Sequence, residues 1–402
     1  MKLTVITESR FVTLPDGSNW AVSSWAADSF WTRYTQHFDQ ILVLARSKPV
    51  DEPPAGATRL AHPDVRLLPL PHYLGPTEMM RQLPGLVSAV RKHVQQPMAY
   101  ILRVPGWLGL LAGRVASTRN LPYAIEVVSD PFDVFGPGAS RHPARAAFRW
   151  YFSRALRRQC QKAFAVSYVT EQALQQRYPP KATSFTTNYS SIELPSSAFL
   201  AAEPDLAPAA AEPIRIVSVG TMGHLYKAQD LLIDALAINI DAGMKLELSF
   251  VGDGSYRQEL EQRAQDLGIG GHIRFLGQVT HDEVFRIVDG ADLFVLPSRQ
   301  EGLPRAMIEA MARGKPCIGS TVGGIPELLE ENDMVPPNDT RALADKIRDV
   351  ANDRDRLRQM ASRNLEKSRF YASEQLIPRR NEFYSFVKSF TEDHYSKMNL
   401  SV

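Results

Sequence analysis

Two glutamates, Glu301 and Glu309, stand eight positions apart in the segment EGLPRAMIEAMARGKPCIGS. Residues at this spacing lie about 80° apart around one helix, so a shared helical face does not explain them. We expect a loop at Glu301 and a helix that begins at Pro304 and ends near Gly314, which places Glu309 inside the helix. An ionised carboxylate accepts two hydrogen bonds, so either glutamate can hold two neighbouring sugar hydroxyls. The spacing also fits a helix that is simply capped by a loop acid.

The loop before this helix is suited to binding an anion. A helix N-terminus carries free N–H groups and partial positive charge, so the backbone amides of Gly302 and Leu303 can meet a pyrophosphate. Short apolar runs at 292–297 and 315–320 predict buried strands on either side. The sequence therefore predicts a strand, a loop, a helix and a second strand in this order.

The size and composition of the chain favour a globular protein of two domains. Its 402 residues exceed the roughly 250 to 300 at which a single core stops growing, and 44% are apolar. The start, MKLTVITESR, has too few apolar residues for a signal peptide, and we find no apolar run of about 18 residues. Cys160 and Cys317 show neither disulfide nor metal-ligand spacing, so we expect a cytoplasmic protein.

Charge is distributed unevenly along the chain. Residues 1–200 hold 22 Lys and Arg against 13 Asp and Glu, and the remainder holds 24 against 31. Residues 141–162 carry seven Lys and Arg, no acid and several aromatic residues. This pattern fits a helix on an anionic membrane surface, and it also fits a solvated helix whose aromatic residues pack into their own domain. No nucleic-acid-binding module accompanies the charge, so nucleic acid is not an expected partner.

Strands alternate with helices along both halves, which predicts two parallel, doubly wound sheets. The proline- and alanine-rich stretch 196–213 is the expected linker between domains at 1–195 and 214–378. A last helix at about 379–402, after an interruption near Pro378, should cross back onto the first domain. Ligands of such sheets bind outside the carboxyl ends of the strands, here in a cleft between the domains. We expect strands at 2–7, 41–45, 65–70, 98–103, 123–128, 162–167, 184–187, 214–219, 246–251 and 273–275.

The second half resembles the donor domain of retaining glycosyltransferases of family 4, of the bacterial exopolysaccharide and lipid-linked oligosaccharide type. The resemblance rests on three runs in the same order as in that family, and it is looser in the first half, at FAVSYVTEQALQQRYPP. It implies an α/β protein of GT-B fold, with two doubly wound Rossmann-like domains facing across a cleft. The three runs are VSVGTMGHLYKAQDLLIDAL (217–236), SFVGDGSYRQELEQ (249–262) and IRFLGQVTHDEVFRIVDGADLFVLPSRQEGLPRAMIEAMARGKPCIGSTVGGIPELLE (273–330).

The resemblance implies roles for individual residues. By similarity, Glu301 is catalytic and lies beside the donor sugar's hydroxyls, whereas Glu309 holds the ribose diol. The amides of Gly302 and Leu303 would meet the diphosphate. Lys227 aligns with the family's phosphate-binding lysine, and its ammonium would neutralise charge on the departing nucleoside diphosphate. The implied donor-binding residues are Gly220, Thr221, Lys227, Gly252, Gly277, Val279, Glu301, Gly302, Leu303, Pro304 and Glu309.

Two departures from the family pattern affect these expectations. Thr221 stands where an arginine is frequent in the family, so one cation is missing unless Arg299 or Arg305 replaces it. In the first domain, Ser129 and Asp130 stand where many relatives have a histidine. Asp130 is therefore the candidate catalytic residue on the acceptor side, and a loop-capping role is the alternative.

The sequence shows no metal-ligand set. Asp353 and Asp355 superficially resemble a metal-binding acid pair, yet they lie in a charged helical stretch and are expected to be solvated. Because a helix N-terminus and Lys227 can serve the diphosphate, we expect neither a metal nor another cofactor. The segment VGDGSYR (251–257) lacks the third glycine of a dinucleotide fingerprint, which argues against a dehydrogenase.

The expected function is transfer of a hexosyl group, with retention, from a nucleoside-diphosphate sugar to an acceptor hydroxyl. By family frequency a uridine nucleotide is expected more than a guanosine nucleotide. The basic first half suggests a lipid-linked saccharide as acceptor and a place at the inner face of a membrane. A nucleotide-sugar epimerase or hydrolase of the same fold and a non-catalytic nucleotide-sugar-binding partner are the alternatives.

Overall fold

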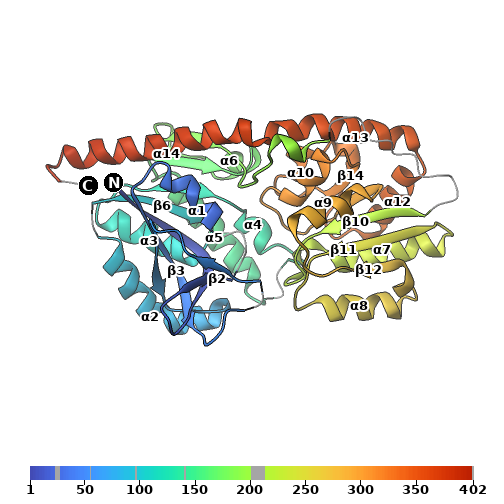
Figure 1. Cartoon of the computed structure of the whole chain (residues 1–402), viewed down its shortest axis with the longest axis horizontal. Coiled ribbons are helices and arrows are strands. Elements are labelled where there is room, and N and C mark those ends of the chain that lie inside the picture. Colours follow the sequence, from blue (N-terminus) through green and yellow to red (C-terminus); the bar gives the residue numbers. More distant parts are fainter. Residues whose placement is uncertain (23–27, 55, 96, 140–141, 201–212, 401–402) are drawn as a thin grey trace.

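The computed structural model describes residues 1–22, 28–54, 56–95, 97–139, 142–200 and 213–400. The chain forms two α/β halves that lie side by side, each around its own sheet (Figure 1). In the first half, seven parallel strands run in the order β5-β3-β1-β6-β7-β8-β9. They are β1 (Lys2–Thr13), β3 (Gln40–Pro49), β5 (Val65–Leu70), β6 (Ala99–Val104), β7 (Ala124–Val127), β8 (Ala165–Tyr168) and β9 (Phe185–Asn188).

Two short antiparallel strands extend the end of β1, which the sequence did not predict. β2 (Asn19–Ala21) pairs with β1, and β4 (Thr58–Leu60) pairs with β2. Gly17, with φ of +79°, forms the tight turn between β1 and β2, where its amide donates to the Leu14 carbonyl. The first sheet is therefore mixed rather than purely parallel.

The sheet of the second half is entirely parallel, in the order β12-β11-β10-β13-β14-β15. This order reverses direction beside β10, as in doubly wound folds, and places the loops after the strands at one edge. The strands are β10 (Ile214–Val219), β11 (Leu246–Val251), β12 (Ile273–Phe275), β13 (Leu293–Leu296), β14 (Cys317–Ser320) and β15 (Met334–Val335).

Helices cover the sheets of both halves. The first half has α1 (Asp28–Thr35), α2 (Gly75–His93), α3 (Trp107–Thr118), α4 (Pro131–Val134), α5 (Arg145–Cys160) and α6 (Ala173–Arg177). The second has α7 (Gln229–Asp241), α8 (Arg257–Asp266), α9 (His281–Asp289), α10 (Arg305–Ala312), α11 (Ile325–Leu328), α12 (Thr340–Ala351) and α13 (Arg354–Ser368). One cluster of buried apolar side chains continues from the first half into the second, from Leu3 on β1 to Met307 on α10. Burial of this shared apolar surface holds the two halves together.

The last helix, α14 (Ser373–Ser396), crosses back onto the first half and packs on β9, β8 and β6 (Figure 1). The expected interruption near Pro378 is wrong, because this proline lies inside the helix. It removes one backbone hydrogen bond, a local loss that the buried face around Phe383 and Val387 outweighs.

A buried carboxylate fixes α14 to the first sheet. Glu126 on β7 accepts hydrogen bonds from the hydroxyls of Tyr34 at 2.8 Å, Tyr189 at 2.9 Å and Tyr384 on α14 at 2.9 Å, and it pairs with Arg103. Burial alone would raise the pKa of Glu126, but Arg103 and the three phenols hold it below its usual value. The ionised group is therefore the form that the fold stabilises.

Residues 201–212 of the predicted linker lie outside the described residues. On its near side, Ser196–Ala198 forms a 3-10 helix, and the Leu200 amide donates to the Ala312 carbonyl of the second half. Of the helices described, none has the length and apolar character needed to cross a membrane.

Candidate active site

Three glycines that follow successive strands lie against one another. The Gly220 amide, after β10, donates to the Val251 carbonyl, and the Gly252 amide, after β11, donates to the Gly277 carbonyl, both at 2.9 Å. A Cβ on Gly252, where φ is +128°, would lie 2.2 Å from the Gly220 carbonyl oxygen. The structure thus brings together three predicted donor-binding residues, and the close approach of the turns requires glycine at position 252.

Two other predicted residues border these turns. Thr221 is exposed, and its hydroxyl donates to the Asp253 carbonyl at 3.3 Å and accepts from the Gly223 amide at 3.1 Å. Its side chain therefore orders the loop after β10. Val279, which follows Gly277, is partly buried and packs against the shared apolar cluster.

Lys227 and Glu301 form a largely buried ion pair. The Lys227 Nζ lies 2.6 Å from the Glu301 Oε1, and their side chains are 15% and 8% exposed. The Ser298 hydroxyl, which sequence analysis did not single out, donates to the same oxygen at 2.7 Å. The methylenes of Lys227 also lie against Gly220. A lysine ammonium has three N–H donors, so it can bind Glu301 and a further anion together.

The loop after Glu301 has the predicted free amides. Among the described residues, neither the Gly302 nor the Leu303 backbone N–H has a hydrogen-bond acceptor. The Gly302 carbonyl accepts from the Gly324 amide at 2.7 Å, which fixes the loop. Pro304 is the N-cap of α10 rather than its first residue, because its ψ of 105° is extended.

Glu309 lies on the first turns of α10 and is partly buried. Its Oε1 is 3.4 Å from the Nε2 of His281, the first residue of α9. The hydrogen bond to Glu309 raises the pKa of His281 above its usual value. Sequence analysis missed His281, because the two residues are brought together only by the packing of α9 against α10.

The two arginines considered for the missing cation differ in their contacts. The Arg299 guanidinium donates two hydrogen bonds to Asp230, at 2.7 and 2.9 Å, and a third to the Leu225 carbonyl. It is fully engaged in the second half and cannot replace the arginine absent at Thr221. Arg305 is exposed at the start of α10.

The loop between Glu301 and α10 is pressed against the first half. A Cβ on Gly302 would lie 2.5 Å from the Val128 carbonyl oxygen and 3.4 Å from the Ser129 Cα. Nearby, the Gly323 amide donates to the Asp133 carboxylate at 3.1 Å. The amides available for an anion therefore lie at the junction of the two halves.

Glu327 on α11 forms a second contact across the junction. Its carboxylate accepts from three consecutive amides of the first half, those of Glu171 at 2.6 Å, Gln172 at 2.9 Å and Ala173 at 2.6 Å. Charge-assisted hydrogen bonds of this kind are stronger than neutral ones. Glu327 lies in a motif that sequence analysis quoted, but no local pattern there indicates its partners.

Asp130 has the contacts of a structural residue. It is 2% exposed, caps α4 by accepting from the Phe132 amide at 2.8 Å, pairs with Arg177 and accepts from the Tyr178 hydroxyl. Of the two roles left open by the sequence, these contacts favour capping. Burial and the neighbouring Asp130 charge raise the pKa of Asp133 to about 6.

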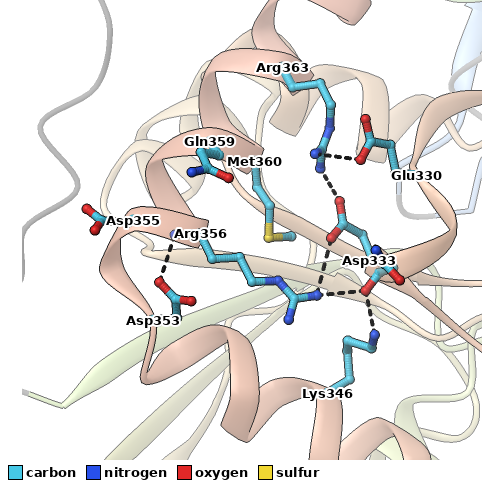
Figure 2. A pocket seen from close by; sticks show the side chains of 10 residues that line it. Glu330, Asp333, Lys346, Asp353, Asp355, Arg356, Gln359, Met360 and Arg363 are labelled. Carbon is cyan, nitrogen blue, oxygen red and sulfur yellow. Dashed lines mark hydrogen bonds and ion pairs between the residues drawn. The ribbon is translucent and has the colours of Figure 1, made fainter.

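Asp353, the N-cap of α13, and Asp355, in its first turn, line a hollow of about 420 Å³ on the second half (Figure 2). Asp353 caps the helix by accepting from the Arg356 amide at 2.9 Å, and Asp355 is 82% exposed. The hollow's charges are mutually paired, since Asp333 contacts both Arg356 and Arg363. Within the described ranges, no group of three or more His, Cys, Asp or Glu could hold a metal ion.

Comparison with known families and sequences finds similarity to glycosyltransferases. Residues 206–367 match the family model described as glycosyl transferases group 1. Protein CapJ of Staphylococcus aureus is 25% identical over 79% of this chain and 78% of its own length. The amylovoran biosynthesis glycosyltransferase AmsK of Erwinia amylovora is 34% identical over 33% of this chain and 35% of its own length. Six further relatives are likewise matched over only 33% to 44% of their length.

Solved structures agree over nearly the whole chain. The sucrose-phosphate synthase of Thermosynechococcus elongatus has a TM-score of 0.71 at 19% identity, covering 97% of this chain and 100% of that one. HepE of Anabaena, solved in complex with UDP-glucose, has a TM-score of 0.63 at 17% identity, with the same coverage. At such low identity the likeness bears on the fold, and it confirms the GT-B arrangement of two doubly wound domains.

Proposed function

We propose that the protein is a retaining hexosyltransferase. Residues 206–367 match the family model of glycosyl transferases group 1, and the chain has the GT-B fold. It moves a hexosyl group from a nucleoside-diphosphate sugar to an acceptor hydroxyl. One observation carries this proposal: the Lys227–Glu301 pair lies beside the contacting turns at Gly220, at the end of a loop with two free amides.

The charge of each residue determines which part of the donor it binds. The free amides of Gly302 and Leu303 bind the diphosphate, and the three glycine turns let its oxygens approach the backbone. Glu301 and Glu309 would repel a phosphate, so each faces a neutral hydroxyl, of the sugar and of the ribose respectively. Lys227 remains bound to Glu301 and directs another N–H at the diphosphate.

In the proposed reaction the acceptor oxygen attacks the anomeric carbon on the face that the diphosphate leaves. The bond from carbon to the diphosphate oxygen breaks, the bond to the acceptor oxygen forms, and the acceptor proton passes to the departing phosphate. Lys227 and the two amides stabilise the negative charge that develops there, which electrostatic preorganisation makes effective. The proposal assigns this task to the chain's own groups and calls for no metal ion.

The identities of the nucleotide and of the acceptor are proposed from the relatives and from the charge of the first half. A uridine diphosphate sugar is the first donor to test, because HepE binds UDP-glucose in the same fold. The name of AmsK and the positive charge of residues 1–200 support an acceptor that is a lipid-linked saccharide of polysaccharide or glycolipid assembly. A membrane-peripheral position would follow, with the basic segment 142–162 towards the anionic lipid.

The proposal is tested by thermal shift with nucleoside diphosphates and by turnover of their sugars. A donor that binds the native state should raise the melting temperature by mass action. Glu309→Gln should weaken donor affinity by about tenfold, as expected for a charged hydrogen bond. Glu301→Gln should lower turnover by about a hundredfold with little change in affinity.

The control is Glu331→Gln, which removes an exposed carboxylate from the same half. It should match the wild type in both assays. Near-normal kinetics in Glu301→Gln and Glu309→Gln would remove the site assignment. Binding of a nucleotide sugar without transfer to any lipid fraction would favour a binding partner, and donor consumption without an acceptor would favour an epimerase or hydrolase.

A further inference from the structure

A hollow of about 530 Å³ lies on the first half, between α4, α5 and α6. Four arginines line it: Arg149, Arg154 and Arg157 from α5, and Arg177 from the end of α6. The lining contains no Asp or Glu, and it adds the hydroxyls of Ser153 and Tyr178. Besides the apolar residues Phe132, Ala146 and Trp150, this concave surface presents cations and no carboxylate to a ligand.

Two of the arginines, Arg149 and Arg157, are oriented by backbone carbonyls, whereas Arg177 is paired with Asp130. The Arg149 Nε donates to the Phe132 carbonyl at 2.8 Å, and Arg157 donates to the Arg177 carbonyl at 3.1 and 2.8 Å. Over the part of the chain that the structure describes, no carboxylate pairs with Arg149, Arg154 or Arg157. Backbone carbonyls fix the guanidinium planes of Arg149 and Arg157 but leave their positive charge available, as a preformed site for a phosphate requires.

An apolar surface borders the charged hollow. Trp150 is 66% exposed, whereas the aromatic neighbours Phe148, Tyr151 and Phe152 pack against Trp107. The exposed indole therefore differs from the other aromatic residues of α5, which are buried or partly buried. It offers a flat face on which a sugar ring or an isoprenoid chain can rest.

A chain of contacts that begins at Arg177 links the hollow to the junction between the two halves. Arg177 pairs with Asp130 and lies 3.6 Å from Asp133, and Asp133 accepts from the Gly323 amide of the second half. The amide of the next residue, Gly324, fixes the Gly302 carbonyl of the candidate donor loop. A ligand anchored in the hollow would thus lie beside the junction where the reacting groups meet.

We propose that this hollow binds the phosphate or diphosphate group of the acceptor, with the attached sugar or lipid lying on Trp150. The identification of the ligand as the acceptor rests on the proposed function, whereas the anion site itself does not depend on it. The arginines are the recognition groups, and none of them takes part in the bond changes at the donor.

The test is calorimetric titration with inorganic pyrophosphate. Because pyrophosphate can also bind the donor site, the titration is made in a Lys227→Met background as well as in the wild type. Arg154→Gln, an exposed change that leaves the helix intact, should weaken binding by about tenfold in both backgrounds, and Arg157→Gln should do the same. The matched control is Arg158→Gln, on the same helix but outside the hollow, which should change affinity less than about twofold.

The outcomes separate this inference from the proposed function. Equal losses in Arg154→Gln and Arg158→Gln would indicate diffuse electrostatics and overturn the site, as would pyrophosphate binding that depends only on Lys227. A loss of pyrophosphate affinity in Arg154→Gln but not in Arg158→Gln supports the anion site in the hollow. It does so even if no nucleotide sugar binds, in which case only the proposed function fails.

A second arm identifies the source of the phosphate. Phosphatidylcholine vesicles with and without a polyprenyl diphosphate are sedimented with the wild type and Arg154→Gln. The site is assigned to a lipid-linked acceptor if retention of the protein on the vesicles requires the polyprenyl diphosphate. This retention should also be abolished by competing pyrophosphate and by Arg154→Gln. Pyrophosphate binding without vesicle retention assigns it to a soluble phosphorylated saccharide.

Discussion

The Glu327 carboxylate lies 2.6 Å from the Ala173 backbone nitrogen, although the two residues are 154 positions apart and belong to different halves. With the Glu171 and Gln172 amides it forms a clamp across the junction that closes beside the candidate donor loop. Reaction in a two-domain enzyme requires both halves to meet. We therefore expect this clamp to stabilise the arrangement in which the two halves are in contact, called here the closed state.

Glu327→Gln should weaken the clamp, because it replaces a charged acceptor oxygen by an amide that faces N–H groups. We expect a loss of about 1.5 to 3 kcal/mol in the closed state. Hydrogen exchange of the amides at 171–173 should accelerate by about tenfold or more, and kcat/KM should fall by a similar factor. Glu330→Gln, which removes an exposed partner of Arg363, is the control. Unchanged exchange at 171–173 would contradict the clamp.

Lys227→Met should destabilise the fold as well as the reaction. It leaves the Glu301 carboxylate, 7% exposed, with Ser298 as its remaining partner, and an unpaired buried charge costs about 3 kcal/mol or more. Adding Glu301→Gln should restore much of this stability, because the charge is then absent. Urea denaturation of the two single variants and the double variant measures the coupling. Lys245→Met, at an exposed position, is the control, and simple additivity of the two changes would argue against the pair.

Gly323→Ala should disturb the donor loop through backbone contact. Gly323 has φ of +53°, and a Cβ there would lie 2.2 Å from the Glu301 carbonyl oxygen. Gly243→Ala is matched for conformation, with φ of +88°, but has open space around it. We expect Gly243→Ala to cost about 1 kcal/mol of unfolding free energy. Gly323→Ala should cost at least about 2 kcal/mol more and weaken donor binding, and equal effects in the two variants would exclude the clash.

Asp133→Asn should change the pH dependence of stability. Because the pKa of Asp133 is raised to about 6 by burial and by Asp130, against Arg177, Arg149 and the Gly323 amide, the native state holds an extra proton below that pH. The stability from this proton is fully present below the unfolded pKa and is lost as pH rises through about 6. The rise in the pKa of Asp133 corresponds to at most roughly 3 kcal/mol of unfolding free energy.

Denaturant titrations at about pH 4.5 and pH 7.5 test this expectation. At the lower pH, Asp133→Asn and the wild type should differ little, and at the higher pH the variant should be more stable, because asparagine keeps an acceptor for the Gly323 amide without the charge. Asp355→Asn, at an exposed carboxylate, should show no such difference. A variant that is less stable at the higher pH would mean that the ionised carboxylate supports the junction.

Local sequence patterns determined several strands and therefore the carboxyl ends of the strands, where ligands of such sheets bind. Apolar runs predicted β5, β10, β11 and β12 with the bounds the structure has, because a short buried strand is encoded by its own residues. The family resemblance, rather than local patterning, pointed to Gly220, Lys227 and Glu301, and these residues do come together, since each follows a strand of one parallel sheet.

Only the tertiary structure decided which groups are free and which are engaged. Arg299 and Asp130 were candidates by position, but their partners Asp230 and Arg177 lie 69 and 47 residues away, and no local pattern encodes such pairs. Pro378 marks a helix end by local rules, yet burial of α14 on the first sheet carries the helix through it. Contacts between the halves, such as Glu327 with Ala173, likewise depend on how two separately patterned sheets dock, and that is set by packing across the junction.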